Sequence, residues 1–345
     1  LKPLWLKLCR STGSIGLGTD WMSSIEESEA WFEANAERWL EPLREWTIPA
    51  EMVPLSEGAA RALSSSPEAD SAAAGLDTLA KAIDGAIAAL QGGSGAGPGG
   101  VFVKLSSRSP KDATIADDRM RAEFDRLVAD GAIDRQNPDS LMRGLLRSSL
   151  VALRVQTGQE AVGLLKMSHR IKEDLDLALA AREATGSAPE SELMQVQVMV
   201  RPWVPGLLPA TEFRAIVYGG ELRGISQYFS ECYFAELAAE GAKERIRDRI
   251  MACFAEVKPR IALQNYVIDF AVLPERVLVI ELNVYAPSTG VCLYSWAKDR
   301  KTVFEGGSTA SEVELRIVTR PLSKGALKHA VMERWRPFID HLYTK

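Results

Sequence analysis

The sequence is poor in the residues that form metal sites and nucleophile triads. Three histidines and four cysteines are scattered over 345 residues, and none of them has the close spacing of zinc ligands. No histidine has an evident set of partners for a catalytic triad. The cysteines therefore indicate reduced thiols in a reducing compartment, and zinc chemistry is not expected.

Long apolar runs and an excess of positive charge are also missing. No stretch of about 18 apolar residues occurs, so no membrane span is expected. The 41 Lys and Arg residues against 46 Asp and Glu residues give a net charge of −5, which offers no basic surface for nucleic acid. The first residues are too interrupted by Lys and Gly for a secretory signal. We expect a cytoplasmic protein with no nucleic-acid or membrane partner.

The glycine-rich stretches do not have the features of a phosphate-binding Walker loop. GSIGLG near the N-terminus does not follow a strand, and GGSGAGPGG at 92–100 is not followed by Lys-Ser or Lys-Thr. Together with the Ser- and Ala-rich residues 64–75, the second stretch predicts a flexible insert. The strand-like GVFVKLSS follows at once, so this insert is expected inside a domain and not at a boundary.

Helical periodicity alternates with antiparallel hairpins along the chain. Helices are predicted over 20–46, 76–90, 114–128, 138–149, 169–184, 235–262 and 324–342. Strands are predicted in TIPAEMVPL, VFVKL and MQVQVMVRPWV, in a hairpin over 212–229 that turns at Gly219-Gly220, and in a hairpin over 267–284. This alternation favours an α+β fold with flanking helices. We divide it into an N-terminal lobe, 1–190, and a C-terminal lobe, 191–345.

The hairpin VIDFAVLPERVLVIELNV carries polar side chains inside apolar runs. Pairing Leu273 with Val277 across the PER turn sets Asp269 directly opposite Glu281, with Asn283 on the same face. Facing acids repel unless a cation lies between them, so removing Asp269 is expected to leave the ligand-free protein equally stable or more stable. Three oxygen donors on one face suit Mg²⁺. A solvated strand face is the alternative, and a register slip of one residue would remove the argument.

Two cationic side chains lie in predicted strands where phosphate binding is one interpretation. Lys104 interrupts VFVKL and leads into the polar loop SSRSPKDA, whose amides are able to close over phosphates. The alternative is an edge-strand lysine that reaches water. Arg214 shares a strand face with Glu212 and offers a fork for a phosphate, or else it forms an ordinary cross-strand ion pair.

The end of the strand VMVRPWV has features of an adenine slot. Pro202 ends the ladder hydrogen bonding there, which leaves backbone groups between Arg201 and Trp203 available. A core position for Trp203 is the alternative.

These segments occur in the order found in ATP-grasp nucleotide sites, and the chain more closely resembles the cell division cycle protein 123 family, also called D123. The resemblance covers roughly residues 40–300 and rests on VFVKLSSRSPKDA, LLKMSHRIKEDL, VRPWVPGLLPATEFRAIVYGGELRGISQY and YVIDFAVLPERVLVIELNVYAPSTGVCLYSW. It implies an ATP-grasp-like fold of antiparallel sheets with a nucleotide cleft between two lobes, holding ATP and Mg²⁺. Eukaryotic members are associated with assembly of translation initiation factor two through its gamma subunit.

Carried over by position, the resemblance implies a role for each candidate residue. Lys104 would contact the phosphates, beneath a loop that contains Ser106 and Ser109. The adenine hinge would be Arg201, Trp203 and Val204. The residues facing the nucleotide would be Glu212 and Arg214, and the magnesium ligands would be Asp269, Glu281 and Asn283. Lys104 and Arg214 would be the catalytic groups if the protein is an enzyme.

The chain also departs from the family pattern. It has Ser106-Ser107 where the family has Asn-Trp, Glu281 where the family has Asp, and Tyr228 where the family has Arg. Two functions stay open, beside a degenerate fold that binds no nucleotide. One is an ATP- and Mg²⁺-binding assembly factor, or chaperone, with a protein partner; the gamma subunit is the leading candidate. The other is an ATP-dependent carboxylate–amine ligase that acts through an acyl phosphate.

Overall fold

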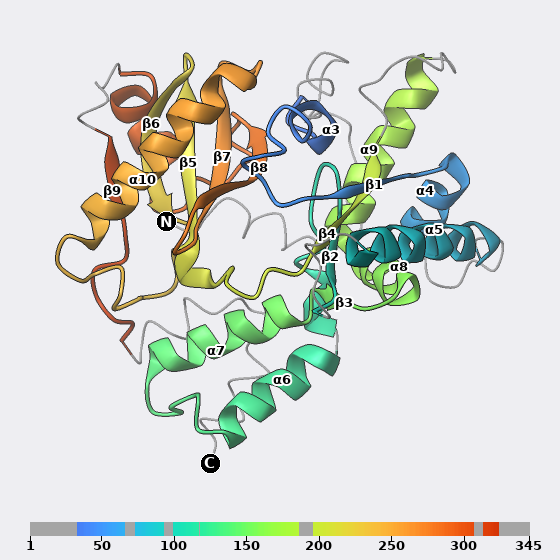
Figure 1. Ribbon diagram of the computed structural model, residues 1–345, viewed down its shortest axis with the longest axis horizontal. Coiled ribbons are helices and arrows are strands. Elements are labelled where there is room, and N and C mark those ends of the chain that lie inside the picture. Colours follow the sequence, from blue (N-terminus) through green and yellow to red (C-terminus); the bar gives the residue numbers. More distant parts are fainter. Residues whose placement is uncertain are drawn as a thin grey trace. The chain divides into compact units, whose positions relative to one another are not determined.

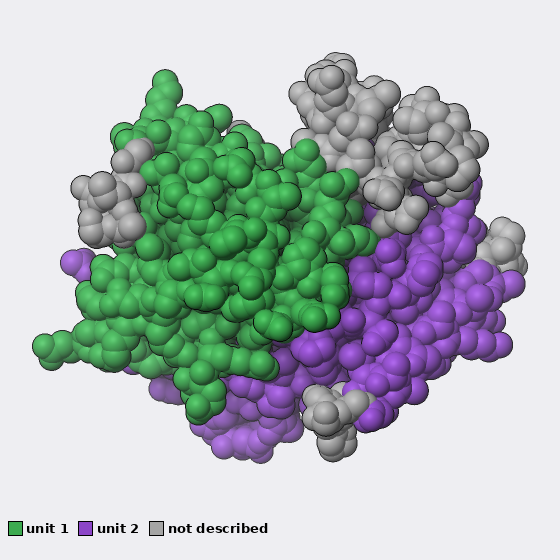
Figure 2. All heavy atoms as spheres, turned by 45° about the horizontal axis from the view of Figure 1, so that its top comes forward, with its two compact units in different colours: residues 1–47, 210–230, 236–317 green, residues 48–209, 231–235, 318–345 purple. Residues whose placement is uncertain are grey.

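The computed structural model describes residues 33–65, 73–92, 99–116, 118–185, 196–306 and 313–323. Its contacts divide the chain into two compact units, coloured in Figure 2. Unit 1 comprises Leu1–Thr47, Ala210–Ser230 and Glu236–Ile317, and unit 2 comprises Ile48–Pro209, Glu231–Ala235 and Val318–Lys345. The predicted helix at 324–342, the first part of the helix at 20–46 and most of the flexible insert lie outside the described residues. The lobe boundary after residue 190 stays a prediction.

Unit 1 contains a five-stranded sheet in the order β8-β7-β5-β6-β9. Its strands are β5 (Glu212–Tyr218), β6 (Glu221–Gln227), β7 (Tyr266–Val272), β8 (Val277–Val284) and β9 (Glu314–Arg316). All neighbours are antiparallel except β9, which runs parallel to β6. Gly219 and Gly220 join β5 to β6 with φ of 61° and 73°, the left-handed values that a two-residue hairpin turn requires. Both predicted hairpins are confirmed.

One face of this sheet is apolar and packs against helix α10 (Ala242–Val257), which runs across the strands in Figure 1. Alternation along the strands places Phe213 and Phe270 on this face, and both are fully buried. Ile250 and Phe254 of α10 are buried as well. The predicted helix 235–262 begins later than expected, because Gly241 precedes it with φ of 67°.

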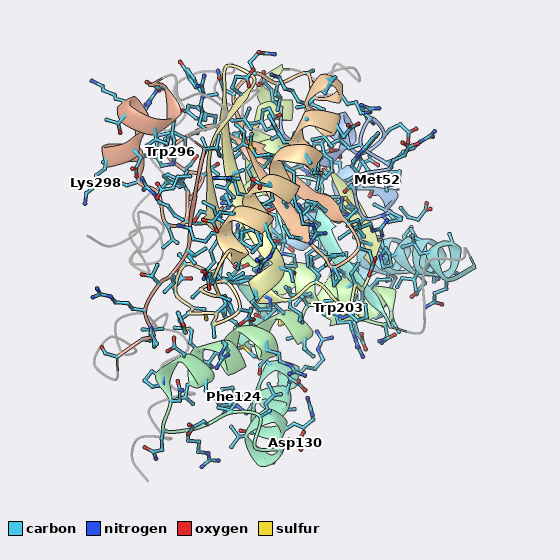
Figure 3. All side chains as sticks on the ribbon, turned by 60° about the vertical axis from the view of Figure 1, so that its left-hand side comes forward. Met52, Phe124, Asp130, Trp203, Trp296 and Lys298 are labelled. Carbon is cyan, nitrogen blue, oxygen red and sulfur yellow. The ribbon has the colours of Figure 1, made fainter. Side chains whose placement is uncertain are left out.

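The opposite face is covered at one end by an aromatic cluster. Tyr285, Tyr294, Trp296 and Phe304 make successive ring contacts around buried Ile216 of β5. Trp296 belongs to the short helix α11 (Trp296–Asp299), which a π-helical turn, Arg300–Phe304, continues. In Figure 3 Trp296 points inward while Lys298 of the same helix points away, and Lys298 is exposed.

The helix predicted through residue 46 is shorter in the structure. Helix α3 spans Ala36–Trp39 and gives way to turns. Pro42 has no N–H for the helical ladder, which accounts for this early end. The segment after the turns joins the sheet instead, since Val279 N donates to Trp46 O at 2.7 Å and Thr47 Oγ1 donates to Val279 O at 2.7 Å.

Unit 2 contains a four-stranded antiparallel sheet in the order β1-β4-β2-β3. Its strands are β1 (Glu51–Pro54), β2 (Val101–Leu105), β3 (Arg154–Val155) and β4 (Gln197–Pro202). Buried valines of β1, β2 and β4 form one face, against which helix α5 (Ala73–Gly92) packs. The helix predicted over 76–90 is confirmed as α5, whose apolar stripe is buried at Leu79, Ile83 and Ile87.

Five further α-helices lie among the described residues of unit 2. They are α4 (Glu57–Ser64), α6 (Asp118–Ala129), α7 (Pro138–Val151), α8 (Gly158–Met167) and α9 (His169–Thr185). The sequence predicted α6, α7 and α9 but missed α4 and α8. Helices α6 and α7 pack together (Figure 1), and Phe124 lies between them (Figure 3). The α+β class with antiparallel sheets and flanking helices is confirmed. In the described ranges no helix combines the length and apolarity that crossing a bilayer requires.

Candidate functional site

The polar face of the unit 1 sheet carries a row of charges across three strands. Arg214 of β5 pairs with Asp269 of β7, which in turn pairs with Glu281 of β8. The Arg214 guanidinium donates from Nε to Asp269 Oδ1 and from Nη2 to Oδ2, both at 2.7 Å. Asp269 is 2% exposed and Arg214 is 8% exposed. This is a buried, bidentate ion pair, the strongest geometry available to these groups.

The ion pair changes the expected effect of the two facing acids. Asp269 and Glu281 do lie opposite each other, but Arg214 already supplies a cation to Asp269. The expectation that removing Asp269 would leave the ligand-free protein as stable or stabilise it is therefore wrong. Removal would leave a buried guanidinium without its partner, which is strongly unfavourable.

The pairing of β7 with β8 near the turn differs from the pairing that the sequence predicted. Val272, not Leu273, pairs with Val277 at the turn, one residue out of the expected register. A bulge between Asp269 and Phe270 then restores the expected pairing, so Asp269 still faces Glu281. Bulges place one extra residue in a strand and re-aim its side chains.

Several neighbours hold Arg214 in place. Its Nη1 donates to Gly290 O at 2.7 Å, and its Cζ lies 4.9 Å from the centre of the Tyr228 ring. Burial alone would lower the pKa of Arg214, but the charge and hydrogen bonds of Asp269 outweigh burial and raise the pKa. The guanidinium is therefore charged at every physiological pH.

The remaining predicted residues of unit 1 lie on this same face. Asn283 Nδ2 donates to Asp269 Oδ2 at 3.3 Å. Glu212 is 6% exposed and lies two residues before Arg214 on β5. Glu281 and Asn283 are half-buried. The structure thus brings Glu212, Arg214, Asp269, Glu281 and Asn283 together on one sheet face.

In unit 2, Lys104 and Arg201 share the sheet face opposite α5. Phe102 of β2 pairs with Arg201 of β4, and Lys104 pairs with Met199, so these four side chains lie on one face. Lys104 and Arg201 are each 3% exposed. The predicted phosphate-contacting lysine and the first hinge residue are therefore neighbours on one surface.

The loop after β2 is tightly organised. Ser106 N donates to Gln197 O at 2.8 Å, and Gln197 N donates to Ser106 Oγ at 3.1 Å, so Ser106 extends the β2–β4 ladder. Leu105 N donates to Arg108 O at 2.9 Å and closes a turn. Ser109 is 5% exposed. Within the described ranges, the N–H groups of Ser107 and Ser109 donate to no protein acceptor.

The strand end at the predicted hinge exposes a backbone acceptor and a backbone donor. Trp203 N donates to Gly100 O at 3.0 Å, so Arg201 and Trp203 direct their backbone groups toward β2. Pro202 and Val204 direct theirs to the other side, where pairing with β1 has ended at Val200. Val204 O accepts from Leu207 N at 3.0 Å. Among the described residues, the Pro202 carbonyl and the Val204 N–H have no backbone partner and are left as an open pair.

Sequence reasoning missed an acid that holds the loop after β2. Asp174 of α9 is 1% exposed and accepts from Ser107 Oγ at 2.7 Å and from Arg108 Nη2 at 2.8 Å. Burial raises the pKa of Asp174 above its usual value, against the charge of Arg108 and the hydrogen bond from Ser107. The EDL sequence around it gives no sign of this role, because the partners lie more than sixty residues away.

The predicted site residues therefore form two groups, one in each unit. In the described part of the chain no three His, Cys, Asp or Glu side chains cluster as a metal site. A hollow of about 370 Å³ on unit 2, lined by residues of α4 and α9 that include Arg61 and Lys172, contains none of the predicted site residues.

An α+β protein with these two sheets has known structural relatives. Cdc123 from Schizosaccharomyces pombe aligns with a TM-score of 0.62 and 18% identity over 84% of this chain and 97% of that one. Its C-terminally truncated form gives 0.63 and 19% over 85% and 98%. At these identities the likeness shows a shared fold. A RimK-domain ATP-grasp protein from Sphaerobacter thermophilus gives only 0.30, a value from which no shared fold follows.

Sequence comparison identifies the family. The model of the D123 family matches residues 147–334, more than half of the chain. The chain belongs to the D123 family. A curated relative from Candida albicans, called translation initiation factor eIF2 assembly protein, is 23% identical over 151 residues. That match spans 42% of this chain and 42% of the relative's length.

Proposed function

We propose that this protein binds ATP with Mg²⁺ and assists the assembly of translation initiation factor eIF2, whose gamma subunit is its partner. The observation that carries the proposal is membership of the D123 family together with two groups of residues suited to a nucleotide. The Candida albicans relative is named for eIF2 assembly, which supports the choice of partner. A net charge of −5 favours a protein partner over RNA.

The donors on the unit 1 sheet fit a magnesium ion. Mg²⁺ prefers six oxygen ligands and is usually held by one or two carboxylates, with water and phosphate oxygens completing the shell. Asp269 and Glu281 face each other, and Asn283 is within hydrogen-bond distance of Asp269. Each carboxylate oxygen has two lone pairs, so Asp269 is able to keep Arg214 and still offer a ligand oxygen.

The unit 2 strand end fits the adenine ring. The edge of adenine presents an amino donor beside a ring-nitrogen acceptor, and the Pro202 carbonyl and Val204 N–H offer the matching acceptor and donor. Both protein groups belong to the backbone, so their spacing is fixed by the strand and does not depend on a rotamer.

The phosphate groups of ATP would meet positive charge and open N–H groups. Lys104 lies in β2, directly before the loop whose Ser107 and Ser109 N–H groups are open, and Ser109 adds a hydroxyl. Successive N–H groups in a turn form a concave anion site.

Bound MgATP would supply negative charge and rigid contacts to the residues around it. The chain's own groups bind and orient the nucleotide: backbone at the hinge, Lys104 and the loop at the phosphates, and carboxylates at the metal. In this role the nucleotide shapes the surface that meets eIF2, and no transfer of its phosphate is required.

The test has two parts. Calorimetry with ATP and MgCl₂ should show binding, and the affinity for either one should fall when the other is omitted. Purified eIF2 gamma subunit should then be retained by the immobilised protein more strongly with MgATP than without. If the protein binds ATP but does not retain the gamma subunit, the proposed partner is wrong. If the protein condenses an acid with an amine in a reaction that depends on MgATP, it is a ligase. Absence of ATP binding contradicts the proposal at its base.

A further inference from the structure

The loop that leaves β2 is fastened to helix α9 by a buried acid. Asp174 Oδ2 accepts from Ser107 Oγ at 2.7 Å, and Asp174 Oδ1 lies 2.8 Å from Arg108 Nη2. Glu173 adds a longer contact, 3.3 Å, to Arg108 Nη1. The Arg108 side chain is 20% exposed, whereas the Glu173 side chain is 64% exposed. Asp174 therefore makes the shorter and better-shielded attachment.

A second attachment runs in the opposite direction, from the loop to the start of α9. Asp112 Oδ1 accepts from Ser168 Oγ at 2.5 Å, and Asp112 Oδ2 accepts from Arg170 N at 3.3 Å. Ser168 Oγ also accepts from Ile171 N, as an N-cap residue does. Loop residues 106–112 and the first turns of α9 are thus joined at both ends of the loop.

The attachment at Asp174 bears directly on the loop's open donors. Ser107 and Arg108 are the two residues that Asp174 holds, and the open N–H groups belong to Ser107 and Ser109. The Ser107 N–H belongs to the peptide before these two residues and the Ser109 N–H to the peptide after them, so holding Ser107 and Arg108 restrains the backbone torsions that set the directions of both N–H groups. An anion site built from backbone N–H groups depends on that direction, because its donors cannot turn independently.

We propose that Asp174 is a positioning residue, which holds loop 106–109 in the conformation that binds the phosphates of the nucleotide. The inference rests on the proposed nucleotide function for the identity of the ligand. Asp174 acts through Ser107 and Arg108 and does not touch the ligand. The hydrogen bond to Asp174 is donated by the Ser107 side chain, so both partners of this attachment belong to the chain itself.

The test variant is Asp174→Asn, which keeps the shape of the side chain but removes its charge. The matched control is Asp176→Asn on the same helix, since among the described residues the polar contacts of Asp176 are to Lys172 and Ser64 and not to the loop. Hydrogen exchange of the ligand-free protein reads the loop directly through the Leu105 and Ser106 amides, whose acceptors are Arg108 O and Gln197 O. Exchange should rise about tenfold at these amides in Asp174→Asn and stay unchanged in Asp176→Asn.

Binding separates positioning from general stability. MgATP affinity should fall about tenfold in Asp174→Asn, while adenosine, measured by competition, should bind as it does to the parent. Equal losses for both ligands, or an unchanged loop exchange, overturn the inference. Ser107→Ala, which keeps the Asp174–Arg108 pair, should shift both readouts in the same direction and replaces Asp174→Asn if that variant does not fold. If the parent binds no ATP, the proposed function fails, and hydrogen exchange alone decides whether Asp174 holds the loop.

Discussion

The two units differ in whether their polar groups are paired within the protein. In unit 1 the charges lie in the middle of neighbouring strands, and Arg214 and Asp269 neutralise each other through two hydrogen bonds. In unit 2 the open groups lie where ladders end, at the Pro202 carbonyl, the Val204 N–H and the loop after β2. Side chains on neighbouring strands of a sheet are able to pair with each other, whereas backbone groups beyond the last ladder hydrogen bond stay available to a ligand.

The largest expected effect concerns the buried ion pair of unit 1. Asp269→Ala should lower the free energy of unfolding of the ligand-free protein by about 3–5 kcal/mol, because Arg214 would be left charged and buried without its partner. Urea denaturation measures the loss. The double variant Arg214→Met, Asp269→Leu should recover most of it, since a buried pair replaced by apolar side chains is often neutral.

A surface pair provides the control for that prediction. Glu221 and Lys258 form an ion pair whose side chains are 55% and 40% exposed. Glu221→Ala should cost less than about 1 kcal/mol, as exposed pairs generally do. Equal losses for Asp269→Ala and Glu221→Ala would show that Arg214 is not held by Asp269 in the way described.

The next effect concerns the packing of α8 against α5 in unit 2. A Cβ on Gly158 would lie 1.9 Å from the Ala80 carbonyl oxygen, so α8 and α5 would have to separate. Gly158→Ala should therefore destabilise the protein by about 1–3 kcal/mol. Gly163 lies in the same helix with nothing within 4 Å of its added Cβ, and Gly163→Ala should stabilise by about 0.5–1 kcal/mol. Thermal unfolding of the pair decides; losses of equal size would contradict the close approach of the two helices.

Local patterns in the sequence were enough to predict much of the fold. Period-two alternation and Gly219-Gly220 indicated the β5–β6 hairpin, and the stripe from Leu79 to Ile87 indicated α5. Helix α8 was missed although its start carries a local signal. Thr157 accepts from Glu160 N, and the Thr-x-x-Glu spacing is typical of a helix N-terminus.

Contacts between distant segments were not predictable in this way. The sequence placed Asp269 opposite Glu281 within one hairpin, but pairing Asp269 with Arg214 requires knowing that β5 lies beside β7. The attachment of Ser107 to Asp174 depends in the same way on how α9 packs. Residue spacing records only contacts within an element or across a turn, so both partners had to come from the structure.

A smaller effect tests the open hinge of unit 2. Val204→Pro removes the N–H proposed to read adenine, and ATP affinity should fall by about 1–2 kcal/mol, the value of one hydrogen bond. Val204→Ala keeps the N–H and should bind ATP as the parent does. ATP should also bind more tightly than CTP or UTP, whose rings present a different edge. Calorimetry measures all of these affinities, and equal binding of the three nucleotides would remove the hinge from the site.

The smallest effect compares one buried thiol in each unit. Burial raises the pKa of both thiols, that of Cys253 in unit 1 to about 11 and that of Cys232 in unit 2 still further. At pH 8 only on the order of one in a thousand Cys253 side chains is then a thiolate, the form that reacts. A thiol reagent should label the half-buried Cys292 first, Cys253 later and Cys232 last, and mass spectrometry in a Cys9→Ser background follows the order.

The same pKa shift gives the sign of a pH effect on stability. The ordinary thiol pKa is 9.0, and a raised folded-state pKa means that the folded protein holds its proton longer. The stabilisation from Cys253 is therefore complete below pH 9 and is lost as the pH rises toward 11. Urea denaturation from pH 8 to 11 should show a steeper loss for the parent than for Cys253→Ala, which has no thiol to titrate. Identical slopes would contradict the raised pKa of Cys253, and labelling of Cys232 before Cys253 would contradict the assignment of the better-shielded thiol to unit 2.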